Sequence, residues 1–163
     1  MNLELNNNVV LITGGTGGIG SEIVAEFLIE DAIVICLIRS ESKMVQLKED
    51  LLKRNISTQS LFSYQCNLMD QYEIKSVIKK ISNEFQRIDT LVNCAGYAKE
   101  YPFALLSESQ ISNMIDLNLK SPMILTQAVL KSMFKQKSGS IINISSISSI
   151  AKGRGIVTYA SSK

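Results

Sequence analysis

Apolar residues in this chain form short continuous runs that alternate with longer segments in which apolar residues recur every three or four positions. Runs of strand length are typical of strands buried on both faces of a sheet, and the wider spacing is typical of amphipathic helices. The pattern predicts strands at 9–13, 32–38, 61–66, 88–93 and 140–145. It predicts helices at 18–30, 41–54, 70–86, 103–119 and 122–136, and a further helix that opens near Val157.

Alternating strands and helices predict an α/β fold with a parallel, doubly wound sheet and right-handed crossovers, the Rossmann fold. In the first helix we expect the apolar face at Ile19, Ile23, Phe27 and Leu28. Sheets of this type that bind dinucleotides normally have the strand order 3-2-1-4-5-6. The chain ends inside the helix that would lead to a sixth strand, so we expect the fold to be truncated after the fifth.

The composition fits one globular domain, because 163 residues with 45% apolar content can bury a real core. Lysine and arginine number 17 against 15 acidic residues, and a net charge of +2 gives no case for a nucleic acid or membrane partner. Residues 1–8 show no secretory signal. The three cysteines lie in apolar runs, where buried and reduced thiols are expected. We therefore expect a cytoplasmic protein. Histidine is absent, which excludes histidine-assisted nucleophiles and argues against a metal enzyme.

A glycine-rich turn, Thr13-Gly14-Gly15-Thr16-Gly17-Gly18-Ile19-Gly20, joins the first strand to the first helix. Gly14 permits a sharp turn, Gly18 lets a phosphate approach the backbone, and Gly20 lets the helix pack closely on the sheet. The N–H groups at the helix start, with the positive end of its dipole, suit a pyrophosphate. A strand before the turn and a helix after it are the context that a dinucleotide site requires.

The end of the second strand bears on the choice of cofactor. An acidic residue at this place usually bonds the ribose 2′-OH of NAD(H), but here the strand ends in Arg39-Ser40, and Glu41 is the first acid. Arg39 suits a charge-assisted contact with a 2′-phosphate, with Ser40 as an auxiliary donor; the alternative is a solvated arginine. The sequence therefore favours NADP(H) over NAD(H).

The last residues, Tyr159-Ala160-Ser161-Ser162-Lys163, place a phenol and an ammonium one helical turn apart on the same face. A cation within ~4–6 Å typically lowers the pKa of an acid by ~1–3 units, so such a pair suits proton transfer near neutral pH. Many solvated helix faces carry the same pair, and this interpretation therefore depends on the other motifs.

With these motifs in order, the chain resembles the short-chain dehydrogenase/reductase family along its whole length. The glycine turn matches that family's Thr-Gly-x-x-x-Gly-x-Gly, and Asn93-Cys94-Ala95-Gly96 matches its Asn-Asn-Ala-Gly, with Cys94 in place of the second asparagine. Asn118 falls on the family's catalytic asparagine. Ser146 falls on its catalytic serine, 13 positions before Tyr159. Ordinary capping roles are the alternatives for Asn118 and Ser146.

The resemblance implies an enzyme of the NADPH-dependent carbonyl reductase type, which moves hydride between a nicotinamide cofactor and a carbonyl or alcohol, with reduction favoured. Tyr159 would transfer the proton, and Lys163 would assist it and bond the nicotinamide ribose. Ser146 would hold the substrate oxygen, and Asn118 would support a water that relays protons. Implied cofactor contacts are Gly14, Thr16, Gly18, Ile19, Gly20, Arg39, Asn67, Leu68, Asn93, Ala95, Gly96, Tyr159 and Lys163.

Asn67 departs from the family's usual aspartate near the adenine, although its amide oxygen can still accept from the adenine amino group. We expect residues 1–163 to be a single NAD(P)-binding Rossmann domain, incomplete at its C-terminus, whose intact form is a homo-oligomer. Two interpretations stay open. The chain is the N-terminal part of a reductase, which is favoured because all four catalytic positions are kept, or it is a short, non-catalytic nucleotide-binding or interaction partner. The substrate cannot be identified from the sequence.

Overall fold

A five-stranded parallel sheet organises the computed structural model, which describes residues 5–151 and 153–163. Residues 1–4, which belong to the segment considered for a secretory signal, and Lys152 lie outside the described residues. The strand order is β3-β2-β1-β4-β5, all neighbours being parallel, which confirms the predicted doubly wound α/β sheet. The strands are β1 (Val9–Thr13), β2 (Ile33–Ile38), β3 (Leu61–Gln65), β4 (Thr90–Asn93) and β5 (Ser140–Asn143).

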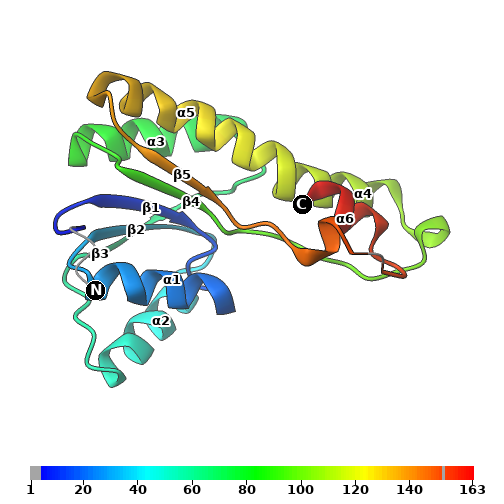
Figure 1. Cartoon of the computed structure of the whole chain (residues 1–163), viewed down its shortest axis with the longest axis horizontal. Coiled ribbons are helices and arrows are strands. Elements are labelled where there is room, and N and C mark those ends of the chain that lie inside the picture. The colour runs from blue at the N-terminus through cyan, green and yellow to red at the C-terminus, as the bar shows by residue number, and fades with distance from the viewer. Residues whose placement is uncertain (1–4, 152) are drawn as a thin grey trace.

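Helices cover both faces of the sheet (Figure 1). One face carries α1 (Gly18–Ile29) and α2 (Glu41–Lys53), and the other carries α3 (Gln71–Phe85) and α5 (Ser121–Gln136). Successive side chains of a strand point to opposite faces, so β1 contributes Val10 and Ile12 to the core under α1, and Val9 and Leu11 to the core under α3 and α5. The continuous apolar runs in the sequence follow from this double burial.

The segment before α5 differs from the prediction of two separate helices. A helix begins at α4 (Glu108–Ile115), passes through a π-helical turn (Asp116–Lys120) and continues directly into α5. It starts at residue 108 rather than 103 because Ser107 and Gln110 form a reciprocal capping box. Pro122 lies in the first turn of α5, where a missing N–H is tolerated.

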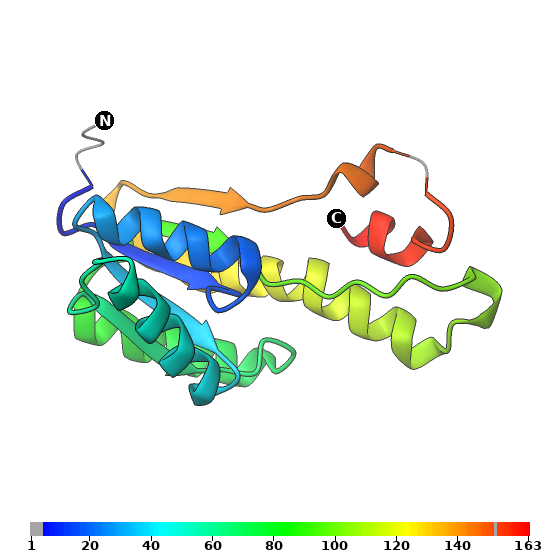
Figure 2. The ribbon, with the colours of Figure 1, turned by 90° about the horizontal axis from the view of Figure 1, so that it is seen from below.

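A second group of elements extends beyond the carboxyl ends of the strands. There α6 (Val157–Ser162) packs beside α4, with the short 3₁₀ turn 147–149 next to it (Figure 2). The Tyr101 amide donates to the Gly155 carbonyl at 2.8 Å, which joins the loop after β4 to the loop before α6. Among the described residues, the helices are too short or too polar to cross a membrane.

Candidate active site

A cleft of about 840 Å³ opens at the carboxyl end of the sheet. In doubly wound sheets, ligands bind at this end, at the point where the connections from two neighbouring strands lead to opposite faces of the sheet. The loops after all five strands contribute to its walls, together with α4 and α6. Every predicted cofactor residue except Asn93 lines it: Gly14, Thr16, Gly18, Ile19, Gly20, Arg39, Asn67, Leu68, Ala95, Gly96, Tyr159 and Lys163.

The glycine turn forms one end of this cleft. Gly14 has φ +70°, and a Cβ there would lie 2.8 Å from the backbone nitrogen of Ala95. A Cβ on Gly20 would overlap the Gly14 carbonyl oxygen, whereas one on Gly18 would face open space. Gly14 therefore lets the turn approach the loop after β4, and Gly20 lets α1 approach the turn. Gly18 leaves room for a phosphate at the helix start.

Thr13 fixes the glycine turn against the loop after β4. Its Oγ1 accepts from the backbone amides of Cys94 and Ala95, both at 3.1 Å, and donates to the Val92 carbonyl at 3.4 Å. Sequence reasoning treated Thr13 only as a motif position. Its register opposite Asn93 in the β1–β4 pair is the signal that could have predicted this contact.

A pair of cations marks the end of β2. Arg39 is exposed and lines the cleft, as predicted, and Ser40 follows it. Lys43 also lines the cleft, from the first turn of α2. Sequence reasoning missed Lys43, although its place in the first turn after the second strand could have indicated it. Two cations here suit a doubly charged phosphate.

Asn67 lies after β3, where an adenine contact was predicted. Its Oδ1 accepts from the Met69 amide at 3.1 Å, which uses one lone pair. A carboxamide oxygen has a second lone pair, and the side-chain nitrogen has two protons, so an adenine edge could still pair with Asn67.

The predicted cofactor residue Asn93 instead lies below the cleft. It is 4% exposed, and its Nδ2 donates to Asn143 Oδ1 at 2.9 Å and to Thr126 Oγ1 at 3.3 Å. These bonds join the ends of β4 and β5 to α5. The motif gave the position of Asn93 correctly, but the alternation of side chains along β4 turns this one toward the interior.

The Tyr159–Lys163 turn forms the other end of the cleft. Both side chains line it, and the Lys163 Nζ donates to the Ile144 carbonyl at 2.9 Å. A Cβ added to Gly96 would lie 3.2 Å from Nζ, so the ammonium sits directly over that backbone. Ser145 Oγ donates to the Lys163 carbonyl oxygen at 2.9 Å. An ammonium has three protons, which leaves two of them for other acceptors.

Ser146 is half-buried beside this end of the cleft, and Ser145 rather than Ser146 is among the lining residues. The Ser146 Oγ accepts from the Ser148 amide at 3.2 Å. Because a hydroxyl that accepts an N–H keeps its own proton, Ser146 can still donate to a substrate oxygen.

Asn118 lies in the π-helical turn and is only 7% exposed. Its Oδ1 accepts from the Tyr97 amide, and its Nδ2 donates to the Tyr97 carbonyl and to Ser162 Oγ, at 2.8, 2.8 and 2.9 Å. An α-helix would aim the amide of residue 122 at the Asn118 carbonyl, but residue 122 is proline and has no N–H. Such π-turns occur frequently at functional sites.

The cysteines near the cleft are held as thiols. Burial raises the pKa of Cys36 to about 12 and that of Cys66 to about 11. Burial also raises the pKa of Cys94, and the nearby Lys163 opposes this effect. The thiolate is the nucleophilic form, so raised pKa values argue against a catalytic cysteine.

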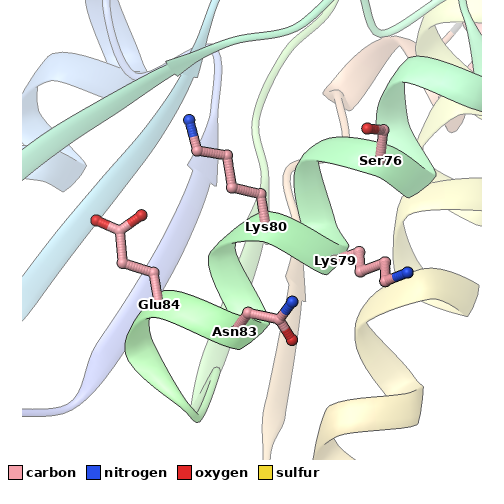
Figure 3. Close-up of a pocket in the computed structure, with 5 residues that line it drawn as sticks. All are labelled: Ser76, Lys79, Lys80, Asn83 and Glu84. Atoms are coloured by element: carbon pink, nitrogen blue, oxygen red, sulfur yellow. The ribbon is translucent and has the colours of Figure 1, made fainter.

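A second depression, of about 490 Å³, lies on the surface of α3 (Figure 3). Its lining residues all come from this one helix, and Lys79 points away from Lys80 and Glu84 (Figure 3). Lys80 lies over the ring of Tyr64, 5.2 Å from its centroid, and Tyr64 donates to Glu84. Burial and this hydrogen bond raise the pKa of Tyr64 to about 12. The group is a surface cluster without convergent polar groups, so the site is the cleft at the sheet end.

The sheet and its cleft define a Rossmann-type NAD(P)-binding protein. Residues 8–163 match the family model for the short chain dehydrogenases, and the chain belongs to this family.

Curated relatives include two 3-oxoacyl-[acyl-carrier-protein] reductases named FabG. The one from Thermotoga maritima is 34% identical over 163 residues, covering 99% of this chain and 64% of the relative. The one from Vibrio cholerae is 37% identical over 164 residues, covering 100% of this chain and 64% of the relative. The chain therefore spans about 64% of the length of these relatives.

Solved structures share the fold. A metagenomic short-chain oxidoreductase in complex with NADP has a TM-score of 0.88 and 27% identity, over 98% of this chain and 71% of that chain. NAD⁺-bound xylitol dehydrogenase has the same TM-score of 0.88 at 21% identity, over 98% of this chain and 61% of that chain, and supports the fold alone.

Proposed function

We propose that the protein carrying this chain is an NADPH-dependent oxidoreductase that reduces a carbonyl group on a small molecule to an alcohol. One observation carries the proposal. A single cleft brings together the glycine turn, the cationic end of β2 and the Tyr159–Lys163 turn, which lie far apart in the sequence. A protein that binds a nucleotide but catalyses no reaction would need only the glycine turn and the cationic end of β2.

The cleft fits the cofactor by shape and by charge. The space above Gly18 at the start of α1 suits the pyrophosphate, and Arg39 with Lys43 suits a 2′-phosphate. The relative solved with NADP supports this choice, since it shares the fold at 27% identity. We expect affinity for NADPH to exceed affinity for NADH.

The chemistry then falls to side chains at the other end of the cleft. NADPH held in this cleft would supply the hydride that the carbonyl carbon takes up. Tyr159 gives its hydroxyl proton to the carbonyl oxygen, so that hydride and proton together make the alcohol. Lys163, whose Nζ is held at 2.9 Å from the Ile144 carbonyl, stabilises the phenolate left on Tyr159. Ser146 donates its free proton to the same substrate oxygen, where negative charge develops. Buried Asn118 supports the relay that reprotonates Tyr159.

The substrate class is proposed from the relatives. Those named 3-oxoacyl-[acyl-carrier-protein] reductase act, by name, on the 3-oxo group of an acyl chain carried by an acyl carrier protein. A 3-oxoacyl thioester is therefore the first substrate to test, ahead of simple ketones. We also propose a homo-oligomeric, cytoplasmic protein for the intact form.

Replacing Tyr159 with Phe tests the proposal, because only the hydroxyl is lost. In the complete gene product, we expect turnover of 3-oxoacyl thioesters with NADPH to fall by about 10²–10⁴-fold. NADPH affinity, measured by fluorescence, should stay within about twofold. Tyr72→Phe, at a site 76% exposed on α3, is the matched control and should leave both values unchanged.

Substantial activity in the Phe variant would move the proton-transfer role to another residue. NADPH binding without turnover on thioester, ketone and alcohol panels would instead favour the non-catalytic interpretation.

A further inference from the structure

We propose that Ser162 is a positioning residue whose buried hydroxyl locks the Asn118 carboxamide to the Tyr159–Lys163 turn. The inference rests on the proposed function, since this turn matters for catalysis only if Tyr159 transfers the proton. Ser162 is 3% exposed and lies on the side of α6 that faces Asn118 rather than the cleft. It therefore acts through its neighbours and not by touching substrate.

The hydrogen bonds of Ser162 have only one possible direction. Asn118 Nδ2 lies 2.9 Å from Ser162 Oγ, and an amide nitrogen can only donate, so Ser162 accepts. The single hydroxyl proton then goes to the Tyr159 carbonyl, 2.8 Å away. The hydroxyl thus connects Asn118 to the backbone of the proposed proton donor.

The other end of Asn118 is equally fixed. Its Oδ1 accepts from the Tyr97 amide and its Nδ2 donates to the Tyr97 carbonyl, both at 2.8 Å. A reversed carboxamide would set N–H against N–H and oxygen against oxygen, so its orientation is determined. Both amide protons are used, one on Tyr97 and one on Ser162. Asn118 is therefore a bridge between the loop after β4 and α6.

This bridge matters because it holds the backbone of the proposed proton donor. The structure describes α6 over Val157–Ser162, with Tyr159 in its first turn. Two other hydrogen bonds hold Lys163. Its Nζ donates to the Ile144 carbonyl, and its carbonyl oxygen accepts from Ser145 Oγ. The contact through Ser162 instead holds the Tyr159 carbonyl. Without the hydroxyl, a buried Asn118 N–H loses its acceptor, and the Tyr159 end of the turn loses an anchor.

The kinetic test compares two neighbouring serines in the complete gene product. Ser162→Ala should lower kcat by about 10- to 100-fold, since displacement of a catalytic group by ~1 Å costs up to ~10²-fold. The KM for the thioester and the Kd for NADPH should change less than about twofold. Ser161→Ala, at the adjacent exposed position, is the control and should leave kcat unchanged. Equal kcat in the two variants, or loss of NADPH binding along with kcat, would overturn the proposal.

A double-mutant cycle separates positioning through Asn118 from a general packing effect. If Ser162 acts through Asn118, then adding Ser162→Ala to Asn118→Ala should lower kcat by less than about twofold. Fully multiplicative losses would show that the two residues act independently, against the proposal.

A measurement that needs no turnover keeps this inference apart from the proposed function. In ¹⁵N-labelled protein, the side-chain amide protons of Asn118 should exchange slowly with D₂O and should exchange about tenfold faster in Ser162→Ala, but not in Ser161→Ala. An inactive parent protein with this result would refute the reductase proposal and keep the Ser162 bridge. Unchanged exchange in Ser162→Ala would refute the bridge.

Discussion

Arg39 is the side chain on which the choice of cofactor depends. It is exposed at the end of β2 and lines the cleft where an acid would select NAD(H). A charge-assisted phosphate contact contributes ~1.5–3 kcal/mol, roughly tenfold to a hundredfold in Kd. Arg39→Asp should therefore reverse a preference for NADPH into one for NADH, as measured by fluorescence titration.

Lys43→Ala is the control for this reversal. Lys43 shares the cleft end with Arg39, so its loss should weaken NADPH binding without improving NADH binding. Equal affinity of the parent protein for the two cofactors would contradict the assignment of Arg39.

Gly20 makes a prediction about stability as well as binding. A Cβ at this position would overlap the Gly14 carbonyl oxygen, so Gly20→Ala must push α1 away from the turn. Overpacking of this kind typically costs ~1–3 kcal/mol of unfolding free energy, which urea denaturation would measure. NADPH affinity should fall as well, because the helix start moves.

Gly18→Ala separates the two effects. A Cβ on Gly18 faces open space, so the unfolding free energy should stay within about 1 kcal/mol of the parent while NADPH binding weakens. Equal destabilisation by both variants would mean that the close approach at Gly20 is not the cause.

Most of the residues predicted from the motifs line one cleft, because motif spacing determines where the chain passes. Motif spacing does not determine the direction in which a side chain points. Asn93 holds its motif position, yet its side chain enters the interior toward Thr126 and Asn143. Ser162 lies within the quoted Tyr159–Lys163 motif, but its role depends on a partner 44 residues away, which local spacing cannot show.

At the scale of elements, the apolar pattern predicted every strand and the strand order, since buried runs and helix crossovers leave few alternatives. In α1 the expected apolar face is confirmed for Leu28, which is buried, and for Ile23 and Phe27, which pack partly buried against the core. The pattern was wrong for Ile19, which is 66% exposed and lines the cleft, and it did not indicate the other buried residues, Gly20, Val24 and Ala25. A hydrophobic side chain at a ligand site cannot be told from a core residue by periodicity.

The apolar pattern did not predict the π-helical turn either. It inserts an extra residue into one helical turn, which periodicity between Phe103 and Gln136 does not reveal. Pro122 indicated a helix start, and the structure instead continues the helix through it, because its missing N–H falls beside the π-turn. Asn118, for which we propose a role in the proton relay, lies at this irregularity.

Cys36, a buried thiol in β2, predicts how stability depends on pH. Burial raises the pKa of Cys36 from 9.0 to about 12. The folded state therefore keeps its proton where the unfolded state has lost it, and this contribution is present below pH 9 and is lost as the pH rises toward 12. We expect unfolding free energy to fall by up to ~1.4 kcal/mol per pH unit from this thiol between pH ~9 and ~11.

Urea unfolding of the parent protein and of Cys36→Ala at pH 8 and pH 10.5 measures this slope. The Ala variant should be less stable at pH 8, because a buried side chain is shortened, but should lose less stability on going to pH 10.5. Identical slopes would show that Cys36 does not titrate with unfolding.

At the scale of the whole molecule, the cleft lies between parts of the chain that are far apart in the sequence. Its walls come from α1 and the end of β2 on one side, and from α4 and α6, which extend beyond the strands, on the other (Figure 2). A ligand that spans the cleft holds these parts together and binds only the folded chain.

Such a ligand must raise the temperature of unfolding. At 100 times its Kd, NADPH should add ~2.7 kcal/mol, and ~2–4 °C per kcal/mol for a domain of this size gives a rise in Tm of about 5–10 °C. Tyr159→Phe should keep the full rise in Tm, whereas Arg39→Asp should show this rise with NADH rather than NADPH.

Adenosine 2′,5′-bisphosphate reaches only the Arg39 end of the cleft. At the same concentration as NADPH, 100 times the Kd of NADPH, it should give a smaller rise in Tm. An equal rise with the bisphosphate would show that the Tyr159–Lys163 end takes no part in cofactor binding, and no rise with NADPH would mean that the cleft is not its site.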